Sequence, residues 1–369
     1  MRIGEFEFNL RELAGSMGDF GTLFPLAIGY IAVCGMNPAG FLVMMGLANI
    51  VTGLVYRLPM PIEPKKAIAA TAIAQKWSPS LIYASGFGTG IVWLVLGFTG
   101  LIHKIAKITP RCVTRGIQLT LGILLAIRGF KMISSFWLLG IISLIIVLIL
   151  RKSRYAPAAL VLILLGVALV VLSGKMPGIL QVKITFPPLT IFTFREVWQV
   201  MILVGFAQIF LTLTNAVVAT AALIKHYWPE KPVTEKKLAI NMGIMNVAVP
   251  FFGGMPMCHG AGGLAGQHYF GARTGGTNII EGAIEISLGL FLARSIANLF
   301  SAFPASIIGA MMFLVGIQLA RFVKDVRGWN ILIVALTTSI SLWINMAVGF
   351  IAGLAAYYLL KRPLKINQP

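Results

Sequence analysis

Two short stretches of the chain combine residue types that suit the binding of an anion. The first carries Lys65 and Lys66 directly after the proline-rich residues 58–64. The second carries the small residues 260–263 after the glycine- and proline-rich residues 250–256. Proline resists the helix interior, so a helix is expected to begin only after each of these runs. The N-terminus of a helix presents unpaired N–H groups and the positive end of its dipole, and both attract anions.

The side chains at these two helix starts suggest distinct roles. Lys66 is the strongest candidate for direct attraction of an anion, with Lys65 as a second cation beside it. His259 can donate a hydrogen bond to an oxyanion, and the alternative for it is N-capping or packing. The glycines among residues 260–263 leave backbone amides unshielded, and the alternative for them is helix packing. Glu63 would oppose an anion, so it is expected to be paired or protonated.

Polar residues also occur inside predicted apolar spans. Gln208, Thr212 and Asn215 recur at steps of three and four residues, which places them on one face of a helix. That face either lines a cavity or bonds neighbouring helices. Asp19 lies in a glycine-rich span, where a charge is costly and tends to be functional. Asp19 either forms a structural ion pair, with Lys65 or Lys66 as its partner, or carries a proton.

One further charge inside a predicted span has no clear role in this scheme. Arg294 lies in the span that also carries Glu281 and Glu285, one turn apart. These two carboxylates are its candidate partners. The histidines at 259 and 268 are nine positions apart, which is not a metal-binding spacing, so no metal and no cofactor are predicted.

The elements that position these residues must lie in a membrane. The chain has 369 residues, of which 58% are hydrophobic and 11% charged, with a mean hydropathy of +0.90. A soluble domain of this length carries roughly 25% charged residues. The start of the chain lacks the features of a cleaved signal peptide. The three cysteines lie in or beside apolar spans, so neither a disulfide framework nor a zinc site is indicated.

The net charge of +19 could suggest a nucleic-acid partner, but the positions of the charges favour membrane topology. Basic residues gather in short loops between apolar segments, as is typical of cytoplasmic loops. We therefore predict a multi-pass protein of the cell membrane, with both termini in the cytoplasm and no nucleic-acid partner. The basic clusters are Lys104/Lys107/Arg111/Arg115, Arg151/Lys152/Arg154, Lys225/Lys231/Lys236/Lys237, Arg321/Lys324/Arg327 and Lys361/Arg362/Lys365.

The apolar pattern predicts an all-α fold with fourteen segments, seven on each side of a polar loop at 174–195. An odd number per half forces the halves to be inverted relative to each other, as in many secondary transporters. The first repeat is predicted at 1–175 and the second at 176–369. The predicted segments are 12–33, 38–57, 64–76, 80–101, 112–130, 136–150, 156–173, 196–224, 236–252, 259–272, 279–299, 304–321, 328–343 and 345–360.

Weak internal similarity supports two repeats. The triplet at 60–62 matches that at 255–257, and the following Pro-to-Pro spacings are 49 and 48 positions. Gly122 and Gly316 each follow the second proline by 12 positions. Segments 64–76 and 259–272 are too short for a core of about 30 Å at 1.5 Å per residue. Each is therefore predicted to start mid-membrane, and inversion would bring the two starts together as one anion site.

Four stretches of sequence are more specific than this general pattern. They read GSMGDFGT at 15–22, PIEPKKAIAA at 61–70, QIFLTLTNAVVAT at 208–220 and MPMCHGAGGLAG at 255–266. Together they resemble the molybdate transporter family, a branch of the sulfate permease superfamily, over nearly the whole chain. The resemblance implies a core domain of segments one to four and eight to eleven, and a gate domain of segments five to seven and twelve to fourteen. It also implies oxyanion uptake by relative motion of the two domains, and often a homodimer.

The resemblance places the anion between the two half-helices, flanked by the first and eighth segments. Glu63 and Lys65 depart from the family, whose members usually have Gln and Met there; these two charges either compensate each other or Glu63 couples transport to protons. The STAS domain of typical sulfate permeases is absent, as it generally is in the molybdate branch. Asp19 and Glu63 are the predicted coupling residues. The predicted substrate-binding residues are Lys66, Lys65, Ala67, His259, Gly260, Ala261, Gly262, Gln208, Thr212, Asn215 and Gly18.

These features favour a proton-coupled secondary carrier for molybdate, with tungstate as another candidate substrate, over other functions. A sulfate carrier is the nearest alternative because tetrahedral dianions make nearly the same hydrogen bonds. A uracil-type nucleobase carrier fits two lysines less well, and a channel would show unsaturable flux. An enzyme acting on lipid phosphates would need aspartate clusters or a nucleophile set, and only 11 acidic residues are present.

Overall fold

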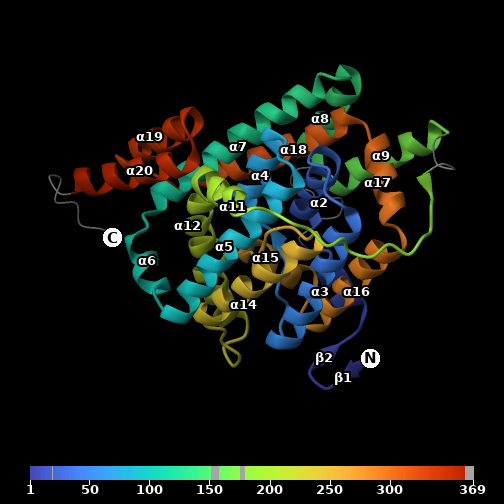
Figure 1. Cartoon of the computed structure of the whole chain (residues 1–369), viewed down its shortest axis with the longest axis horizontal. Coiled ribbons are helices and arrows are strands. Elements are labelled where there is room, and N and C mark those ends of the chain that lie inside the picture. The colour runs from blue at the N-terminus through green and yellow to red at the C-terminus, as the bar shows by residue number, and fades with distance from the viewer. Residues whose placement is uncertain (19, 151–157, 175–178, 362–369) are drawn as a thin grey trace.

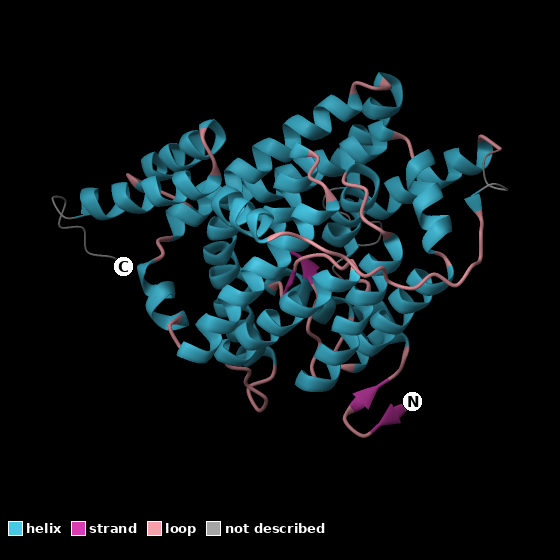
Figure 2. Cartoon of the chain, in the orientation of Figure 1, coloured by secondary structure: helices cyan, strands magenta, loops and turns pink. Residues whose placement is uncertain are grey.

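The computed structural model of the chain describes residues 1–18, 20–150, 158–174 and 179–361. Those residues are mostly helical, and the short strands are confined to the N-terminus and the middle of the molecule (Figure 2). The predicted all-α membrane protein is confirmed at this level. Within the described ranges, the helices long and apolar enough to cross a membrane are Pro38–Tyr56, Pro79–Thr99, Arg111–Ile133, Phe194–Tyr227 and Ala305–Asp325.

In the first half of the chain, several helices begin where sequence chemistry favours a start. Asn37 and Ser78 accept backbone N–H bonds as N-caps of α3 and α5, and each of these helices has proline at its first position. The elements are β1 (Arg2–Ile3), β2 (Phe6–Glu7), α1 (Leu10–Ser16), α2 (Phe20–Ile28), the π-helix η1 (Gly29–Val33), α3 (Pro38–Tyr56), β3 (Glu63–Pro64), α4 (Lys66–Gln75), α5 (Pro79–Thr99), α6 (Ile102–Ile108), α7 (Arg111–Ile133), α8 (Trp137–Leu150) and α9 (Ala158–Leu172).

The second half follows the extended residues 180–193. Thr193 forms a capping box with Glu196 at the start of α11, and Thr234 caps α14. The elements are α11 (Phe194–Val200), η2 (Met201–Gly205), α12 (Phe206–Thr212), η3 (Leu213–Val218), α13 (Ala219–Tyr227), α14 (Glu235–Ala248), η4 (Val249–Phe252), β4 (Met257–Cys258), α15 (Ala261–Phe270), α16 (Gly276–Phe291), α17 (Ala293–Ala302), α18 (Ala305–Ala320), η5 (Arg321–Asp325), α19 (Asn330–Trp343) and α20 (Met346–Lys361).

The predicted segments coincide with these helices to within a few residues, apart from the segments at 12–33 and 279–299 and the start of the segment at 156–173, which lies outside the described residues. The span predicted at 12–33 is divided, because α1 ends at Ser16 and α2 begins at Phe20. The prediction of one span at 279–299 is wrong, because α16 ends at Phe291 and α17 begins after Leu292. The extended connection explains the break. Its backbone N–H groups at Lys183 and Thr185 bind the carbonyls of Phe291 and Leu290, which satisfies the end of α16.

The two short segments are separate helices whose starts lie side by side. α4 and α15 have ten residues each, so each is about 15 Å long, half of a bilayer core of about 30 Å. β3 and β4 directly precede them and pair antiparallel, with Glu63 opposite Cys258 and Pro64 opposite Met257. Figure 2 shows this pair of strands enclosed by helices. The sequence expectation of two helices that start together in the interior is met.

Close glycine contacts join several helix pairs reciprocally. A Cβ on Gly122 of α7 would lie 2.6 Å from the Gly316 carbonyl of α18, and a Cβ on Gly316 would lie 2.6 Å from the Gly122 carbonyl. Gly46 of α3 and Gly282 of α16 show the same reciprocity, at 2.5 and 2.4 Å. Small residues at these positions let the helix backbones touch.

The helices form two groups. α3 packs on α16 and α5 packs on α14, and these pairs lie along the lower side of the view in Figure 1. α7 packs on α18, with α8, α9, α19 and α20 around them, along the opposite side of the view. α4 and α12 contact α7, so the interior half-helix α4 faces the boundary between the two groups.

One carboxylate contributes to holding the N-terminal hairpin to the first group, beside the hydrogen bond from the Glu7 backbone N–H to Thr274 Oγ1 at 3.1 Å. Glu5 lies 2.7 Å from Arg57, at the end of α3, and 2.7 Å from Lys231, in the loop before α14. The hydrogen bond from Lys231, followed by that from Arg57, holds the pKa of Glu5 below its usual range. The stabilisation that these ion pairs give to the docked hairpin is therefore present above the unfolded-state pKa of Glu5. It is lost as the pH falls through the folded-state pKa.

We expect the hairpin to be held less tightly on acidification. Hydrogen exchange of the amides in β1 and β2, corrected for the intrinsic rate, should show protection at neutral pH and a loss of protection in the acid range where Glu5 is protonated. The Glu5→Gln variant should show reduced protection at neutral pH and no further loss on acidification. An equal acid-induced loss in that variant would assign the effect to another group.

Candidate functional site

A cavity of about 200 Å³ lies at the boundary between the two groups of helices. Its wall is formed by the starts of both half-helices, by α12, η3 and α13, and by α7, α18 and η5 from the second group. The lining residues are Glu63, Lys66, Gln118, Gln208, Leu211, Thr212, Asn215, Ala216, Ala219, Cys258, His259, Gly260, Ala261, Gly262, Leu319 and Phe322.

The start of α4 is capped by a side chain from α12. The Gln208 Oε1 accepts the backbone N–H of Ala67 at 2.8 Å and that of Ile68 at 3.2 Å. Its Nε2 donates to Thr212 Oγ1 at 2.7 Å. The Ala67 amide, predicted to contact an anion directly, is thus already occupied. The positive end of the α4 dipole therefore meets the Gln208 carboxamide before it meets the cavity.

The start of α15 faces an internal carboxylate. A Cβ on Gly260 would lie 2.4 Å from Glu63 Oε2, and a Cβ on Gly263 would lie 2.2 Å from Oε1, so only glycine allows this approach. Glu63 is buried at 2% exposure and forms an ion pair with Lys66 at 2.9 Å. The hypothesis that Glu63 is paired is met, and its partner is Lys66, not Lys65.

Lys65 is directed away from the cavity. It is the N-cap of α4, and its ammonium, fully buried, donates to Thr89 Oγ1 of α5 at 2.5 Å. Lys66 is the next residue and keeps 31% of its side chain exposed. Consecutive residues at a helix start point in directions roughly 100° apart, because 3.6 residues complete one turn. Lys66 therefore reaches the cavity and Lys65 does not.

His259 lines the cavity with both ring nitrogens engaged. Nδ1 lies 3.3 Å from the Pro61 carbonyl, and Nε2 lies 3.0 Å from Asn241 Oδ1. The Tyr56 ring meets the imidazole edge-on at 5.8 Å. This geometry favours the alternative reading, in which His259 locks β4 against the residues that precede α4.

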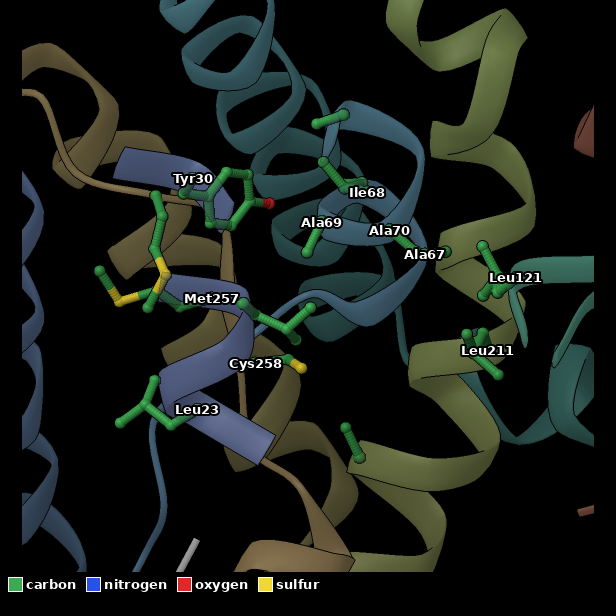
Figure 3. Close-up of a cluster of buried hydrophobic side chains, with 14 of the residues drawn as sticks. Leu23, Tyr30, Ala67, Ile68, Ala69, Ala70, Leu121, Leu211, Met257 and Cys258 are labelled. Atoms are coloured by element: carbon green, nitrogen blue, oxygen red, sulfur yellow. The ribbon is translucent and has the colours of Figure 1, made fainter. Parts of the chain in front are cut away.

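The polar face of the eighth segment opens on the cavity. Gln208, Thr212 and Asn215 all line it, which agrees with the cavity hypothesis for this face. η3 is a π-helical turn that carries Asn215, and such turns are frequent at functional sites. Leu211 lies next to Leu121 of α7, and Cys258 lies below the start of α4 (Figure 3).

The remaining predicted residues lie elsewhere. Gly18 packs against α15, where a Cβ would come within 2.5 Å of the Gln267 backbone nitrogen. Asp19 lies outside the described residues. Glu281 accepts a hydrogen bond from Gln267 at 3.3 Å, and Glu285 accepts one from Asn49 at 2.9 Å.

The pairing of Arg294 with Glu281 or Glu285 stays a prediction. Arg294 is exposed at the start of α17, just after the break that ends α16. The two carboxylates are buried, and each accepts a hydrogen bond from a side-chain amide.

Sequence reasoning missed the wall contributed by the second group. Gln118 of α7, Leu319 of α18 and Phe322 of η5 face the half-helices across the cavity. Gln118 was detectable in principle, since it is a buried amide on an apolar helix, one turn after Arg115. The contact of α7 with α4 is long-range, however, and periodicity alone does not reveal it.

The cavity combines one ammonium, one carboxylate, amide and hydroxyl groups, and apolar walls. Such a set offers hydrogen-bond donors and one ammonium to a small anion. Among the described residues, no three His, Cys, Asp or Glu side chains gather as a metal-ligand group.

Solved structures with the same architecture define the class of fold. SLC26A9 matches with a TM-score of 0.73 at 13% identity, covering 95% of this chain and 65% of that one. The transmembrane domain of the cyanobacterial bicarbonate transporter BicA matches with a TM-score of 0.67 at 16% identity, covering 93% and 97%. The chain thus has the fold of the SLC26 and sulfate permease group of membrane transporters.

Within that fold, the sequence identifies the family. A family model described as "Molybdate transporter of MFS superfamily" matches residues 11–125 and 200–319. Molybdate transporter 1 of Arabidopsis thaliana is 32% identical, over 96% of this chain and 89% of the relative. Molybdate transporter 2 of the same plant is 30% identical, over 95% and 87%. The chain belongs to the molybdate transporter family.

Proposed function

We propose that this protein carries molybdate across the cell membrane as a secondary active transporter. The observation that carries the proposal is the cavity at which both half-helices begin, with Lys66 on its wall. The names of the relatives support molybdate as the substrate, and tungstate is a further candidate. All of them are transporters, which supports a role without catalysis.

The proposed architecture is fourteen membrane segments in two inverted repeats, 1–175 and 176–369. In it, segments one to four and eight to eleven form the core domain, and the remaining segments form the gate. Two observations support a two-fold relation. Glu63 and Cys258 follow the matched Met60 and Met255 by three positions each, and they pair with each other across the antiparallel bridge. Gly122 and Gly316, matched by the internal repeat, pack against each other reciprocally.

We propose that the anion binds between Lys66 and the start of α15. The amides and Cα atoms at 260–262 would face it from one side, and Thr212 and Asn215 from another. Gln208 and His259 would shape the site through their capping contacts. Ala67 would contribute through its bond to Gln208. Lys65 and Gly18 would support the half-helices from behind.

Glu63 is the proposed coupling residue. Its carboxylate already occupies the positive start of α15 and neutralises Lys66. A dianion beside it is favourable only if a proton neutralises this carboxylate, because like charges in a low-dielectric site repel strongly. The anion and a proton would therefore enter together. Movement of the core past the gate would then expose the loaded site on the other side.

The remaining parts of the proposal are both termini in the cytoplasm and assembly as a homodimer. The basic clusters between segments support the first. The second rests on the family resemblance.

Sulfate is a second candidate substrate. The putative sulfate transporter YbaR of Bacillus subtilis is 24% identical over 80% of this chain and 64% of its own length. The polar groups of the cavity suit any tetrahedral dianion, so competition must decide.

Uptake into proteoliposomes tests the function. We expect saturable molybdate uptake that is driven by an inward proton gradient and persists in a modest excess of sulfate. Abolition of molybdate uptake by that excess would favour sulfate, and unsaturable flux would indicate a channel. The Glu63→Gln variant should still bind molybdate but lose acceleration by the proton gradient.

A further inference from the structure

In the second helix group, the hydrogen bond with Arg115 fixes the orientation of the Gln118 side-chain amide. Its Oε1 accepts from Arg115 Nη1 at 2.9 Å. A guanidinium has only donors, so the carboxamide oxygen must face Arg115 and the NH₂ group must point the other way. Gln118 is buried at 3% exposure and lines the cavity.

Among the described residues, the NH₂ group of Gln118 makes no hydrogen bond, and its nitrogen is not fully enclosed by protein. It therefore opens towards the cavity. An amide donor in that position can bind a negatively charged oxygen and cannot bind a cation.

Arg115 is itself held in place by residues of η5. Its Nη2 lies 2.5 Å from Asp325 Oδ2, and its Nε donates to both carboxylate oxygens at 3.1 Å. Its guanidinium carbon also lies 5.1 Å from the centre of the Phe322 ring, a cation–π distance. Arg115 thereby links α7 to η5, and a donor held by such a network loses little entropy when it binds.

We propose that Gln118 is a substrate ligand supplied by the gate, oriented by the Arg115–Asp325 pair. The proposal rests on the proposed function, since it names a second wall for the same anion site. Lys66 and the start of α15 hold the anion on the core, and Gln118 donates one hydrogen bond from the opposite wall. Because the two walls belong to different helix groups, this contact exists only where core and gate meet around the loaded cavity. Gln118 thus couples recognition of the oxyanion to the position of the core.

The test compares three variants in proteoliposomes by molybdate KM and kcat. Gln118→Leu removes the donor, and a lost hydrogen bond to a charged group corresponds to a rise in KM of about tenfold to 100-fold. Gln118→Glu keeps the size and the contact with Arg115, but it replaces the donor by a negative group and should raise KM at least as much. Gln318→Leu is the matched control, because Gln318 is exposed on α18 next to Leu319; its KM should stay at the wild-type value.

A further variant tests whether the Arg115–Asp325 ion pair positions Gln118. Asp325→Asn should raise KM by no more than about fivefold, since the pair is partly exposed, and should leave kcat unchanged. It should have no further effect in the Gln118→Leu background. An additional rise there would show that Asp325 acts independently of Gln118.

The transport results distinguish a failure of the Gln118 proposal from a failure of the proposed function. If wild-type protein transports molybdate and Lys66→Ala is impaired, but both Gln118 variants keep the wild-type KM, the gate ligand is refuted while the carrier stands. If wild-type protein neither binds nor transports molybdate, the proposed function itself fails. Should Gln118→Leu not fold, Gln118→Glu decides, because it preserves the contact with Arg115.

Discussion

Replacing Lys66 by alanine is expected to weaken molybdate binding by about 100-fold or more. A hydrogen bond to a charged group is worth about 1.5–3 kcal/mol, and each 1.4 kcal/mol is a factor of ten. The substitution also leaves Glu63, exposed by only 2%, without its ion-pair partner beside the anion. Isothermal titration of purified protein with molybdate measures the loss directly.

The double variant Glu63→Gln/Lys66→Ala separates these two contributions. With the carboxylate gone, the repulsion disappears, and binding should recover in part relative to Lys66→Ala alone. Glu63→Gln by itself should bind molybdate at least as tightly as the wild type, with less dependence on pH. No recovery in the double variant would mean that Glu63 does not act on the anion site.

The second large effect concerns the glycines at the start of α15. Gly263→Ala would drive a methyl group to 2.2 Å from Glu63 Oε1 and 2.9 Å from the Pro61 Cβ. Overpacking typically costs about 1–3 kcal/mol, and the upper end is expected here because little can move around the paired strands. Thermal melting in detergent should show a clear drop, together with loss of molybdate binding.

Gly262→Ala provides the matched control. Nothing lies within 4 Å of a Cβ at this position, and Gly262 lines the cavity. Melting should therefore be unchanged or slightly raised, because alanine favours the helix over glycine by about 1 kcal/mol. The methyl group would nevertheless occupy space beside the anion and lower its affinity. If Gly262→Ala melted earlier than Gly263→Ala, the described start of α15 would be incorrect.

Much of this fold follows from local signals in the sequence. Apolar runs set the approximate helix bounds. Pro38 and Pro79, each after a capping residue, stand at the first position of two helices, within one residue of the predicted starts at 38 and 80. The break at Leu292 was not predictable in this way. It carries neither proline nor glycine, and it depends on the extended connection from 180–193, which lies about 100 positions earlier in the chain.

The site was predictable to the level of its two helix starts. The residue types and the proline-broken approach correctly indicated which segments meet. The side-chain partners were not predictable, because they come from distant parts of the chain. Gln208 caps α4 from α12, and Glu63 lies against the glycines of α15. The α4 amides expected to be bare are therefore already bonded to Gln208, and the start of α15 has a carboxylate beside its glycines.

The choice between Lys65 and Lys66 shows the same limit. Both lysines stand at one helix start, and sequence alone assigned both to the anion. Only the packing of α5 against α4 decides that Lys65 meets Thr89 while Lys66 turns to the cavity. For Gln118 the limit acts in the opposite direction. Nothing in the sequence around this residue indicates a site, and it reaches the cavity only because α7 packs against α4.

The position of molybdenum in the protein tests the central claim most directly. Crystals grown with molybdate and measured at the molybdenum absorption edge would locate the metal by its anomalous scattering. The expected result is a single peak in the cavity, beside the Lys66 ammonium and the start of α15. A peak at any other place in the protein, with this cavity empty, would contradict the account.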